Sequence, residues 1–390
     1  MKILVAHNYY CQPGGEDRVF KAETELLRQE GHAVLEYTDS NERTKTMRPW
    51  QVAADCFWSA RTHRRIAAFV RKEKPEIAHF HNIFPLISPA AYDACLKNGV
   101  KVVQSLHNSR LICPAARLFR DGRYCEDCLT APFAWPGIRW GCYRHSRVQT
   151  AMVALMTRWH RWRRTWQTQV DAYIVFTDFY KQQCVKWGLP EEKIFIKPHF
   201  LPADPLARGV PAEKIFLFVG RLSADKGVRT LLQAWQGGMD DFSLEIIGNG
   251  DDFDHLQAIL NREKMLTARL LGQQSPEEVY RRMKQASAVV VPSEVTESFG
   301  MVALEALACG VPVIASDLGG LGEMIRGTGA GLLFPAGDAQ CLRERLVWAS
   351  RNPDRMELMG KTGRRLFEAR YARQSNANIL TDIYRQVLFP

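Results

Sequence analysis

The chain has 390 residues, of which 46% are apolar and 24% are charged, and its formal net charge is +10 at pH 7. This composition excludes a disordered chain, and the length predicts about two domains, each with its own core. No segment reaches the roughly 20 unbroken apolar residues of a membrane-spanning helix, and the first apolar run is too short for a secretory signal, so we expect a cytoplasmic protein with reduced or metal-bound cysteines.

The first half of the chain alternates apolar runs with stretches of helical periodicity. Strands are predicted at residues 2–7, 33–38, 77–81, 100–106, 172–176 and 193–197, with helices at 16–30, 52–73, 89–97, 147–168 and 178–187. Such alternation predicts a parallel sheet covered by helices on both faces. Gly14 and Gly15 follow the first strand, where they either form a plain turn or let the backbone approach a phosphate or an acceptor.

A long irregular stretch follows the strand at 100–106 and begins with His107. A single histidine after a strand is more often structural than functional.

Four cysteines in the stretch follow the spacing C-x11-C-x2-C-x13-C: Cys113, Cys125, Cys128 and Cys142. This pattern is compatible with a tetrahedral structural zinc site, which would order a loop that has little core. Free buried thiols, an adventitious disulfide and an iron–sulfur centre are the alternatives. We assign these cysteines no catalytic role.

Residues 129–170 contain seven arginines and five tryptophans but no acidic residue. Along residues 147–169, apolar side chains recur at three- and four-residue spacing on one helix face: Val148, Met152, Leu155, Trp159, Trp162 and Trp166. Such a face suits an anionic membrane surface, although packing on the first domain with a solvated basic rim would give the same pattern. The two halves differ in charge, with +11 in residues 1–200 (30 basic, 19 acidic) and −1 in residues 201–390 (22 basic, 23 acidic), so we expect them to meet different partners.

The second half repeats the alternation after a proline-rich linker at residues 198–214. Strands are predicted near residues 215–219, 243–247, 268–271, 288–291, 312–315 and 331–334, and amphipathic helices at 353–370 and 373–388. The predicted domains cover residues 1–200, with a cysteine-containing insertion at about 107–145, and residues 201–372. Residues 373–390 form a separate C-terminal helix.

Two turns in the second half carry groups suited to a nucleotide. Arg221 follows Gly220 at the end of a strand, and Lys226 lies at the start of the next helix. A guanidinium fork and an ammonium at a helix N-terminus suit a diphosphate. Gly248 and Asn249 form a turn after the next strand, for which a structural role is the simpler interpretation.

Residues 292–314 place Glu297 in the turn between a buried strand and a helix, and Glu305 roughly two turns along that helix. The run Ser298-Phe299-Gly300 directly follows the first glutamate. Parallel sheets bind ligands at the carboxyl ends of their strands, so two carboxylates beside a glycine suit a polyhydroxyl ligand such as ribose or a hexose. Two glutamates without further context are more often solvated side chains.

Both glutamates lie in a block that resembles the E-x7-E signature of the retaining glycosyltransferases of family 4, ESFGMVALEALACGVPVIAS. Two further segments resemble that family's phosphate segment, FLFVGRLSADKG, and its glycine loop with the first helix, QPGGEDRVFKAETELLRQEGHAV. The likeness runs from residue 1 to about 385 in the expected order. It implies the GT-B architecture, an α/β fold of two Rossmann-like parallel-sheet domains facing a central cleft. The first domain would bind the acceptor and the second the nucleotide sugar, with the final helix crossing back to the first.

The resemblance also implies a role for each candidate residue. Glu305 would hold the ribose hydroxyls, and Glu297 would bind hydroxyls of the transferred sugar, near His107. Arg221 and Lys226 would stabilise the charge on the leaving diphosphate, so that catalysis needs no metal. The implied contacts to the nucleotide sugar further include Gly14, Gly15, Gly220, Gly248, Asn249, Ser298, Phe299 and Gly300.

The function implied is retaining transfer of a hexosyl group from a UDP- or GDP-sugar to a glycan or lipid-linked acceptor. The segment HNSRLICPAARLFRDGRYCEDC resembles the part of the family that builds bacterial surface polysaccharides, such as lipopolysaccharide and exopolysaccharide. Such an enzyme would be cytoplasmic and peripheral on the inner face of the membrane. The alternatives are a sugar-nucleotide epimerase or phosphorylase of the same fold, and a basic zinc-containing binding module on a degenerate GT-B fold. No recognition motif for nucleic acid accompanies the positive charge. The run Pro198-His199-Phe200 departs from the Asn-Gly turn that is common in the family.

Overall fold

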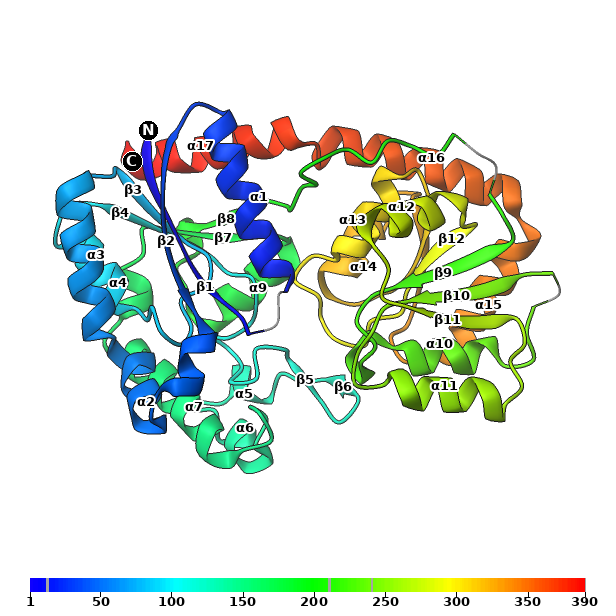
Figure 1. Cartoon of the computed structure of the whole chain (residues 1–390), viewed down its shortest axis with the longest axis horizontal. Coiled ribbons are helices and arrows are strands. Elements are labelled where there is room, and N and C mark those ends of the chain that lie inside the picture. Colours follow the sequence, from blue (N-terminus) through cyan, green and yellow to red (C-terminus); the bar gives the residue numbers. More distant parts are fainter. Residues whose placement is uncertain (12–13, 210–211, 240, 390) are drawn as a thin grey trace. The chain divides into compact units, whose positions relative to one another are not determined.

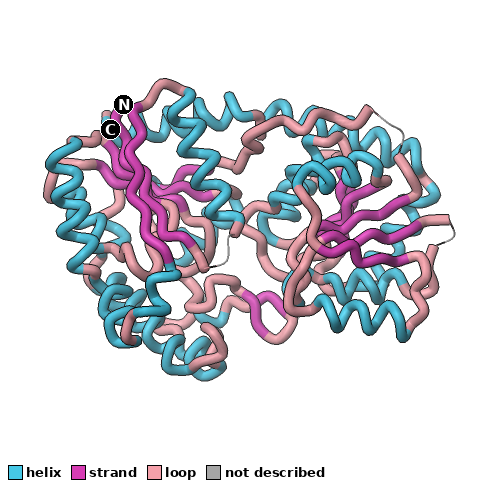
Figure 2. The backbone as a smooth tube through the Cα atoms, in the orientation of Figure 1, coloured by secondary structure: helices cyan, strands magenta, loops and turns pink. Residues whose placement is uncertain are grey.

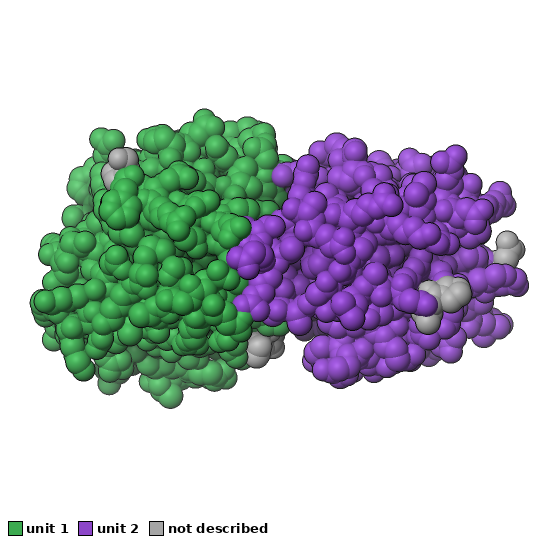
Figure 3. All heavy atoms as spheres, turned by 90° about the horizontal axis from the view of Figure 1, so that it is seen from above, with its two compact units in different colours: residues 1–118, 126–198, 376–390 green, residues 119–125, 199–375 purple. Residues whose placement is uncertain are grey.

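The computed structural model describes residues 1–11, 14–209, 212–239 and 241–389. Parts of three predicted segments lie outside the described residues: Gln12 and Pro13 of the glycine-loop motif, residues 210–211 of the linker, and Pro390. The chain forms two compact units, coloured separately in Figure 3. Unit 1 comprises residues 1–118, 126–198 and 376–390, and unit 2 comprises residues 119–125 and 199–375. Residues 119–125 thus group with unit 2, although they lie within the predicted first domain.

Unit 1 is built around a parallel sheet with the strand order β2-β1-β3-β4-β7-β8 (Figure 1). Its strands are Lys2–Tyr9 (β1), Ala33–Ser40 (β2), Ile77–Phe80 (β3), Lys101–Ser105 (β4), Ala172–Val175 (β7) and Ile194–Ile196 (β8). In strand β1, Leu4 pairs with Leu35 of β2 and with Ala78 of β3. The apolar run of β1 is fully buried because neighbouring strands and covering helices exclude water from it.

Helices surround the unit 1 sheet (Figure 2). They are Gly15–Gln29 (α1), Pro49–Trp58 (α2), Ala60–Glu73 (α3), Ala90–Leu96 (α4), Asp127–Thr130 (α5), Trp135–Trp140 (α6), Arg147–Trp162 (α7), Thr165–Thr168 (α8), Asp178–Trp187 (α9) and Arg373–Leu388 (α17), with 3-10 turns at Asn41–Thr46 (η1) and Glu191–Lys193 (η2). Most of α17 therefore belongs to unit 1, although it ends the chain.

Two predicted helices of unit 1 are each interrupted. The stretch 52–73 breaks at Ser59, whose hydroxyl accepts the N–H of Thr62 and so caps α3. The stretch 147–168 breaks at Arg164, which has a φ of +55° and separates α7 from α8. Side-chain periodicity continues through both breaks, so the sequence pattern alone did not reveal them.

Unit 2 contains a second parallel sheet with the strand order β11-β10-β9-β12-β13-β14. Its strands are Ile215–Val219 (β9), Ser243–Ile247 (β10), Ala268–Gly272 (β11), Ala288–Val291 (β12), Val313–Ser316 (β13) and Gly331–Phe334 (β14), with the small hairpin Phe119–Arg120 (β5) and Arg123–Tyr124 (β6). The helices are Val228–Trp235 (α10), Phe253–Arg262 (α11), Pro276–Gln285 (α12), Met301–Ala308 (α13), Gly319–Ile325 (α14), Ala339–Arg351 (α15) and Pro353–Arg370 (α16), with the 3-10 turn Ala224–Lys226 (η3). In Figure 1, α10 and α11 lie on one side of the sheet and α12 and α13 on the other.

Each sheet contains one point at which the strand order reverses. In unit 1 the chain leaves β1 first toward β2 and then toward β3 on the opposite side, and in unit 2 it leaves β9 first toward β10 and later toward β12. The connections after the two strands at such a point lead to helices on opposite faces of the sheet, which leaves a crevice at the carboxyl ends of the strands. Ligands of this fold class bind there. The switch points are therefore β1/β3 in unit 1 and β9/β12 in unit 2.

Candidate functional site

In unit 2, the loops after β9 and β12 touch at the switch point. Gly227 follows η3 with a φ of +68°, and a Cβ at this position would lie 1.8 Å from the carbonyl oxygen of Pro292. The two backbones can approach this closely only because glycine has no side chain. The N–H of Glu294 also donates to the carbonyl of Asp225 over 3.0 Å. The two loops are thus fixed against each other.

Lys226 of the first loop and Glu297 of the second form an ion pair across this contact. The Nζ of Lys226 lies 2.8 Å from Oε1 of Glu297, and both side chains are mostly buried. The hydroxyl of Ser293 donates to the same oxygen. Burial by itself would raise the pKa of Glu297, but the ammonium and the hydroxyl outweigh it, so the pKa is lowered. Glu297 is therefore an ionised acceptor for hydroxyl hydrogens.

Arg221 projects from the end of β9 with a guanidinium that an anion can reach. Its side chain is 54% exposed, and its Nη2 lies 3.7 Å from Oδ2 of the buried Asp225. Gly248 packs directly against the backbone of this loop, because a Cβ at position 248 would lie only 1.8 Å from the carbonyl oxygen of Gly220. The carbonyl of Asn249 accepts a backbone hydrogen bond from the same loop. Gly248 and Asn249 thus hold the loop that carries Arg221.

The helix after β12 places an uncapped N-terminus at the same sheet edge. Gly300 precedes α13 as its N-cap residue with a φ of +101°, and no side chain caps the helix. Amide groups at such an end favour an anion or a hydroxyl oxygen. Glu305 is half-buried on α13. It lies about one turn into the helix rather than the two turns predicted, because the helix begins only at Met301.

Aromatic packing fixes the turn between Glu297 and α13. Phe299 is buried, with its ring edge-on to those of His199 and Tyr371 at centroid distances of 5.2 and 5.7 Å. Ser298 is half-buried beside it. Within unit 2, the structure therefore groups the predicted residues of the β9 and β12 loops around one sheet edge.

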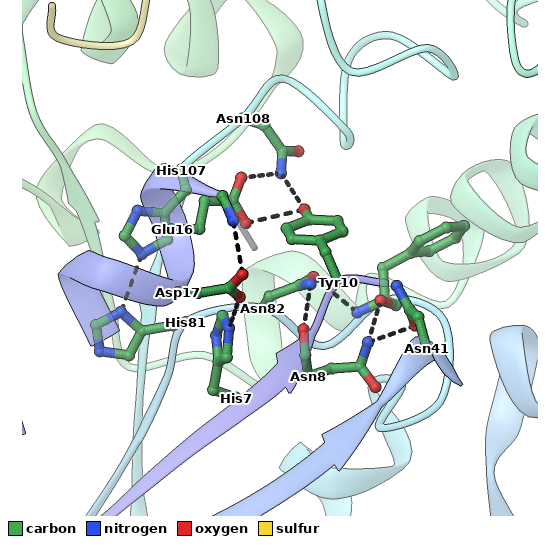
Figure 4. Close-up of polar contacts among 12 residues, drawn as sticks. His7, Asn8, Tyr10, Glu16, Asp17, Asn41, His81, Asn82, His107 and Asn108 are labelled. Atoms are coloured by element: carbon green, nitrogen blue, oxygen red, sulfur yellow. Dashed lines mark hydrogen bonds and ion pairs between the residues drawn. The ribbon is translucent and has the colours of Figure 1, made fainter. Parts of the chain in front are cut away.

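In unit 1, the glycine loop leads into a capped helix at the β1/β3 switch point (Figure 4). The Asp17 carboxylate accepts the N–H of Gly14 over 2.8 Å and contacts Nε2 of His7 over 2.7 Å. Burial lowers the pKa of His7 to about 4 despite this carboxylate. Gly15 is exposed at the first position of α1. Asp17, a residue that the sequence analysis did not single out, thus caps the start of α1.

Glu16 is the second acidic side chain at this point. Its two oxygens accept hydrogen bonds from the Tyr10 hydroxyl at 2.9 Å and from the Asn108 amide at 2.7 Å (Figure 4). Burial raises the pKa of Glu16 even though both hydrogen bonds oppose this change. Its position after β1 and beside the loop after β4 places a polar, hydroxyl-binding group in unit 1.

His107 follows β4 and is joined to a second histidine of unit 1. Its Nε2 lies 3.0 Å from Nδ1 of His81, which follows β3. His81 and its neighbour His79, the third residue of β3, are both buried. The contact with His107 makes His81 part of the candidate site. The sequence does not show this contact, because the two residues are 26 positions apart.

The four cysteines lie in different elements of the irregular stretch. Cys113 is buried in the loop after β4, Cys125 follows β6, Cys128 lies in α5 and Cys142 follows α6. Zinc binding by these residues stays a prediction.

Several residues of the site were missed because their role depends on partners distant in sequence. Ser293, Asp17 and Asn108 are hydrogen-bonding residues of types that are common in any turn. The ion pair of Lys226 and Glu297 joins residues 71 positions apart. The one local signal was Asp17 at the third helical position, where an acidic side chain can cap the preceding backbone N–H.

Comparisons with known proteins agree with this architecture. Residues 13–204 match the family described as Glycosyltransferase Family 4, and residues 208–366 match Glycosyl transferases group 1. A phosphatidyl-myo-inositol mannosyltransferase of Mycobacterium leprae is 36% identical over 159 residues, 39% of this chain and 41% of that protein. The lipopolysaccharide 1,2-N-acetylglucosaminetransferase of Salmonella typhimurium is 27% identical over 206 residues, 47% of this chain and 54% of that protein. The chain thus spans about half the length of these relatives.

A solved structure, Anabaena HepE in complex with UDP, superposes with a TM-score of 0.71 over 99% of this chain and 100% of that one, at 15% identity. This likeness establishes the fold. The chain therefore has the GT-B fold, with its first part matching the Glycosyltransferase Family 4 model and its second part matching the Glycosyl transferases group 1 model.

Proposed function

We propose that this protein is a retaining glycosyltransferase that moves a hexosyl group from a nucleotide sugar to a glycan acceptor in bacterial surface-polysaccharide synthesis. The observation that carries the proposal is the Lys226–Glu297 ion pair at the β9/β12 switch point, beside the accessible Arg221. Two matching glycosyltransferase families and the names of the curated relatives support it. The UDP bound by the structural neighbour favours a UDP-sugar donor.

In the proposed mechanism, unit 2 stabilises the departing nucleotide. The bond between the anomeric carbon and the diphosphate oxygen breaks, and the acceptor oxygen bonds to that carbon on the same face. The leaving diphosphate oxygen takes the acceptor proton. Arg221 and Lys226 supply positive charge where negative charge grows, so no catalytic metal is needed.

Glu297 binds a hydroxyl of the transferred sugar in this mechanism and does not attack the anomeric carbon. One of its oxygens already accepts hydrogen bonds from Lys226 and Ser293, which lowers its nucleophilicity and holds it in place. Glu305 on α13 would hold the ribose hydroxyls. The amides of Phe299 and Gly300, with Ser298, would contact the sugar or diphosphate.

The first test is thermal stabilisation of the purified protein by UDP-, GDP-, ADP- and dTDP-sugars. A ligand at a hundred times its Kd adds about 2.7 kcal/mol of stability, so the correct donor should give a clear rise in Tm. Turnover of that donor should persist in EDTA, and the product should keep the anomeric configuration of the donor. If no sugar nucleotide stabilises the folded protein, the transferase proposal fails.

We also propose that the acceptor is lipid-linked and that unit 1 approaches an anionic membrane. In α7, Val148, Leu155 and Trp162 are 75%, 50% and 70% exposed, although the helix packs through its opposite face. The exposed arginines of the segment 139–164 are Arg139, Arg144, Arg147, Arg158, Arg163 and Arg164. Of the six residues of the predicted face, Val148, Leu155 and Trp162 are exposed, Met152 and Trp159 are half-buried, and Trp166 is buried in α8. No helix in the described ranges is long and apolar enough to cross a membrane.

Sedimentation with lipid vesicles tests the membrane proposal. The protein should bind vesicles that contain phosphatidylglycerol, bind neutral phosphatidylcholine vesicles weakly, and dissociate at high salt, because cationic side chains supply the attraction. Trp162→Ala should weaken binding, whereas Trp348→Ala, which removes a half-exposed tryptophan of unit 2, serves as the control. Equal binding by both variants and wild type would contradict the assignment.

A further inference from the structure

A cleft in unit 1 is formed by α7 together with the irregular stretch that carries the cysteines (Figure 1). Its lining from α7 recurs at three- and four-residue spacing, so these side chains share one face of the helix: Ala154, Thr157, Arg158 and Arg161. The rest of the lining comes from the loop after β4, from residues 131–134 after α5, and from Trp187 of α9. The irregular stretch, to which the proposed mechanism gives no role, therefore helps to form this cleft.

The cleft carries positive charge that no side chain neutralises. It is lined by Arg110, Arg158 and Arg161, and none of the described residues that line it is acidic. None of the three arginines forms an ion pair in the part of the chain that the structure describes. Arg158 is exposed and makes no side-chain hydrogen bond within the described ranges, so its N–H donors are available to a ligand. Guanidinium groups in this state favour an anion, and their planar forks match the oxygens of a phosphate.

Aromatic stacking holds two of these guanidinium groups in place. The Cζ of Arg161 lies 5.2 Å from the ring centre of Trp187, which is buried and lines the same cleft. The Cζ of Arg110 lies 4.5 Å from the ring centre of Phe84, and its Nη1 donates to the carbonyl of Pro114. A stacked guanidinium keeps N–H donors at its edge, and it loses little side-chain freedom when it binds an anion. The cleft is therefore partly preorganised for a phosphate.

The arginines of α7 border the exposed apolar face of the same helix. Arg158 lies three residues after Leu155 and four before Trp162, so the three side chains are neighbours on the helix surface. Leu155 and Trp162 are both exposed. A ligand that joins a phosphate to an apolar chain would contact the cleft and this face together, whereas a free anion would use the arginines alone. The arrangement therefore fits an amphiphilic phosphate.

We propose that this cleft binds the phosphate group of a lipid phosphate, with Arg158 and Arg161 as its ligands and with the lipid chain along Leu155 and Trp162. The inference deepens the proposed function and rests on it for the identity of the lipid, since a glycan joined to a lipid through phosphate would present this group. Binding of the phosphate itself does not depend on glycosyl transfer.

The first experiment is calorimetric titration of the full-length protein with octyl phosphate, below the concentration at which this compound forms micelles. We expect saturable binding. Inorganic phosphate and octyl glucoside should each bind at least about tenfold more weakly, because the first lacks the chain and the second lacks the charge. Inorganic phosphate that binds as tightly as octyl phosphate would overturn the lipid assignment, and octyl glucoside that does so would overturn the role of the arginines.

Three variants that each remove one positive charge separate a defined site from diffuse attraction. Arg158→Gln and Arg161→Gln should each weaken binding of octyl phosphate about tenfold or more, the effect of losing a hydrogen bond to a charged group. Arg163→Gln is the matched control, because Arg163 ends the same helix on a different face and does not line the cleft. It should stay within about twofold of wild type, since salt screens a distant charge. Thermal unfolding checks that each variant is folded. Equal weakening by all three would contradict the proposal.

These titrations can be told apart from the donor screen. Selective binding of octyl phosphate, with no stabilisation by any sugar nucleotide, would keep the lipid-phosphate site and reject the transferase function. Stabilisation by a donor without any binding of octyl phosphate would reject the site and leave the transferase proposal standing.

Discussion

At the scale of single residues, the unit 2 site depends on one ion pair whose members lie on different loops. Lys226 would otherwise be a mobile surface cation, and Glu297 would be an unpaired, mostly buried carboxylate. Held 2.8 Å apart, they keep each other charged and oriented before a ligand arrives. Preorganised charge of this kind stabilises a transition state without the cost of reorganising at the moment of reaction.

The variant Glu297→Gln tests this pair with little change in shape. Loss of the negative charge should lower kcat/KM about a hundredfold, close to 3 kcal/mol, because the sugar hydroxyl and Lys226 both lose a charged partner. Binding of the nucleotide alone should change little. Steady-state kinetics and calorimetric titration with UDP measure the two effects.

Glu245→Gln is the matched control. Glu245 is also a mostly buried carboxylate in an ion pair, 2.7 Å from Arg282, but it lies within strand β10 away from the carboxyl end. The Glu245→Gln variant should lose stability while keeping kcat/KM.

Because the pKa of Glu297 is lowered on folding, its contribution to stability is present above its ordinary pKa and is lost as the pH falls toward the folded value. The stability difference between wild type and Glu297→Gln should therefore shrink in acid.

At the scale of elements, glycines decide how closely the strand-end loops pack. Gly227 and Gly248 lie against backbone carbonyls of Pro292 and Gly220, where any side chain would collide. This contact sets the spacing between the loops that carry Lys226 and Glu297. Loop packing is thus a direct cause of the site geometry.

Gly227→Ala should disturb both stability and activity. The new methyl group would lie 1.8 Å from the Pro292 carbonyl oxygen, and alanine is also disfavoured by the left-handed backbone at this position. We therefore expect the free energy of unfolding to fall by about 3 kcal/mol. Turnover should fall in parallel as the two loops separate. Gly327→Ala isolates the backbone effect, because Gly327 has a φ of +71° and open space around its Cβ position. That control should lose only about 1 kcal/mol and keep its activity. Urea unfolding and kinetics distinguish the two, and equal effects would show that loop contact is unimportant.

For the molecule as a whole, the stability of unit 1 in acid should depend on its buried histidines. Unit 1 contains three histidines, His7, His79 and His160, whose pKa values burial lowers to about 4, 3 and 4. Below the ordinary pKa of 6.5 the unfolded chain binds protons that the folded unit does not. Stability therefore falls as the pH falls from 6.5 toward these values.

Calorimetry at pH 7 and pH 5 tests this pH dependence of stability. Each of the three histidines should reduce the stability of unit 1 by about 2 kcal/mol between these pH values. His160→Gln keeps a donor for the Phe57 carbonyl and should make the pH dependence shallower by that amount. His145→Gln, at an exposed histidine, is the control. An unchanged pH slope in His160→Gln would contradict the burial argument.

The amino-acid sequence was sufficient to predict the alternation of strands and helices, because the period of apolar residues follows directly from the geometry of each element. It also placed Glu297 in the turn after a buried strand and Arg221 at the end of another, since a strand that is buried on both faces is a continuous apolar run. Two helices were predicted as continuous because Ser59 and Arg164 interrupt the backbone without interrupting the side-chain pattern.

Which of these residues act together depends on the fold. Strand order creates the switch points, and it depends on packing between segments that no local pattern relates. The pairing of Lys226 with Glu297, and of His81 with His107, follows from that order. The sequence also left open which face of α7 is exposed, because a helix with apolar residues on several faces can bury any one of them. The fold of unit 1 buries the face around Val153 and Met156 and leaves Trp162 exposed.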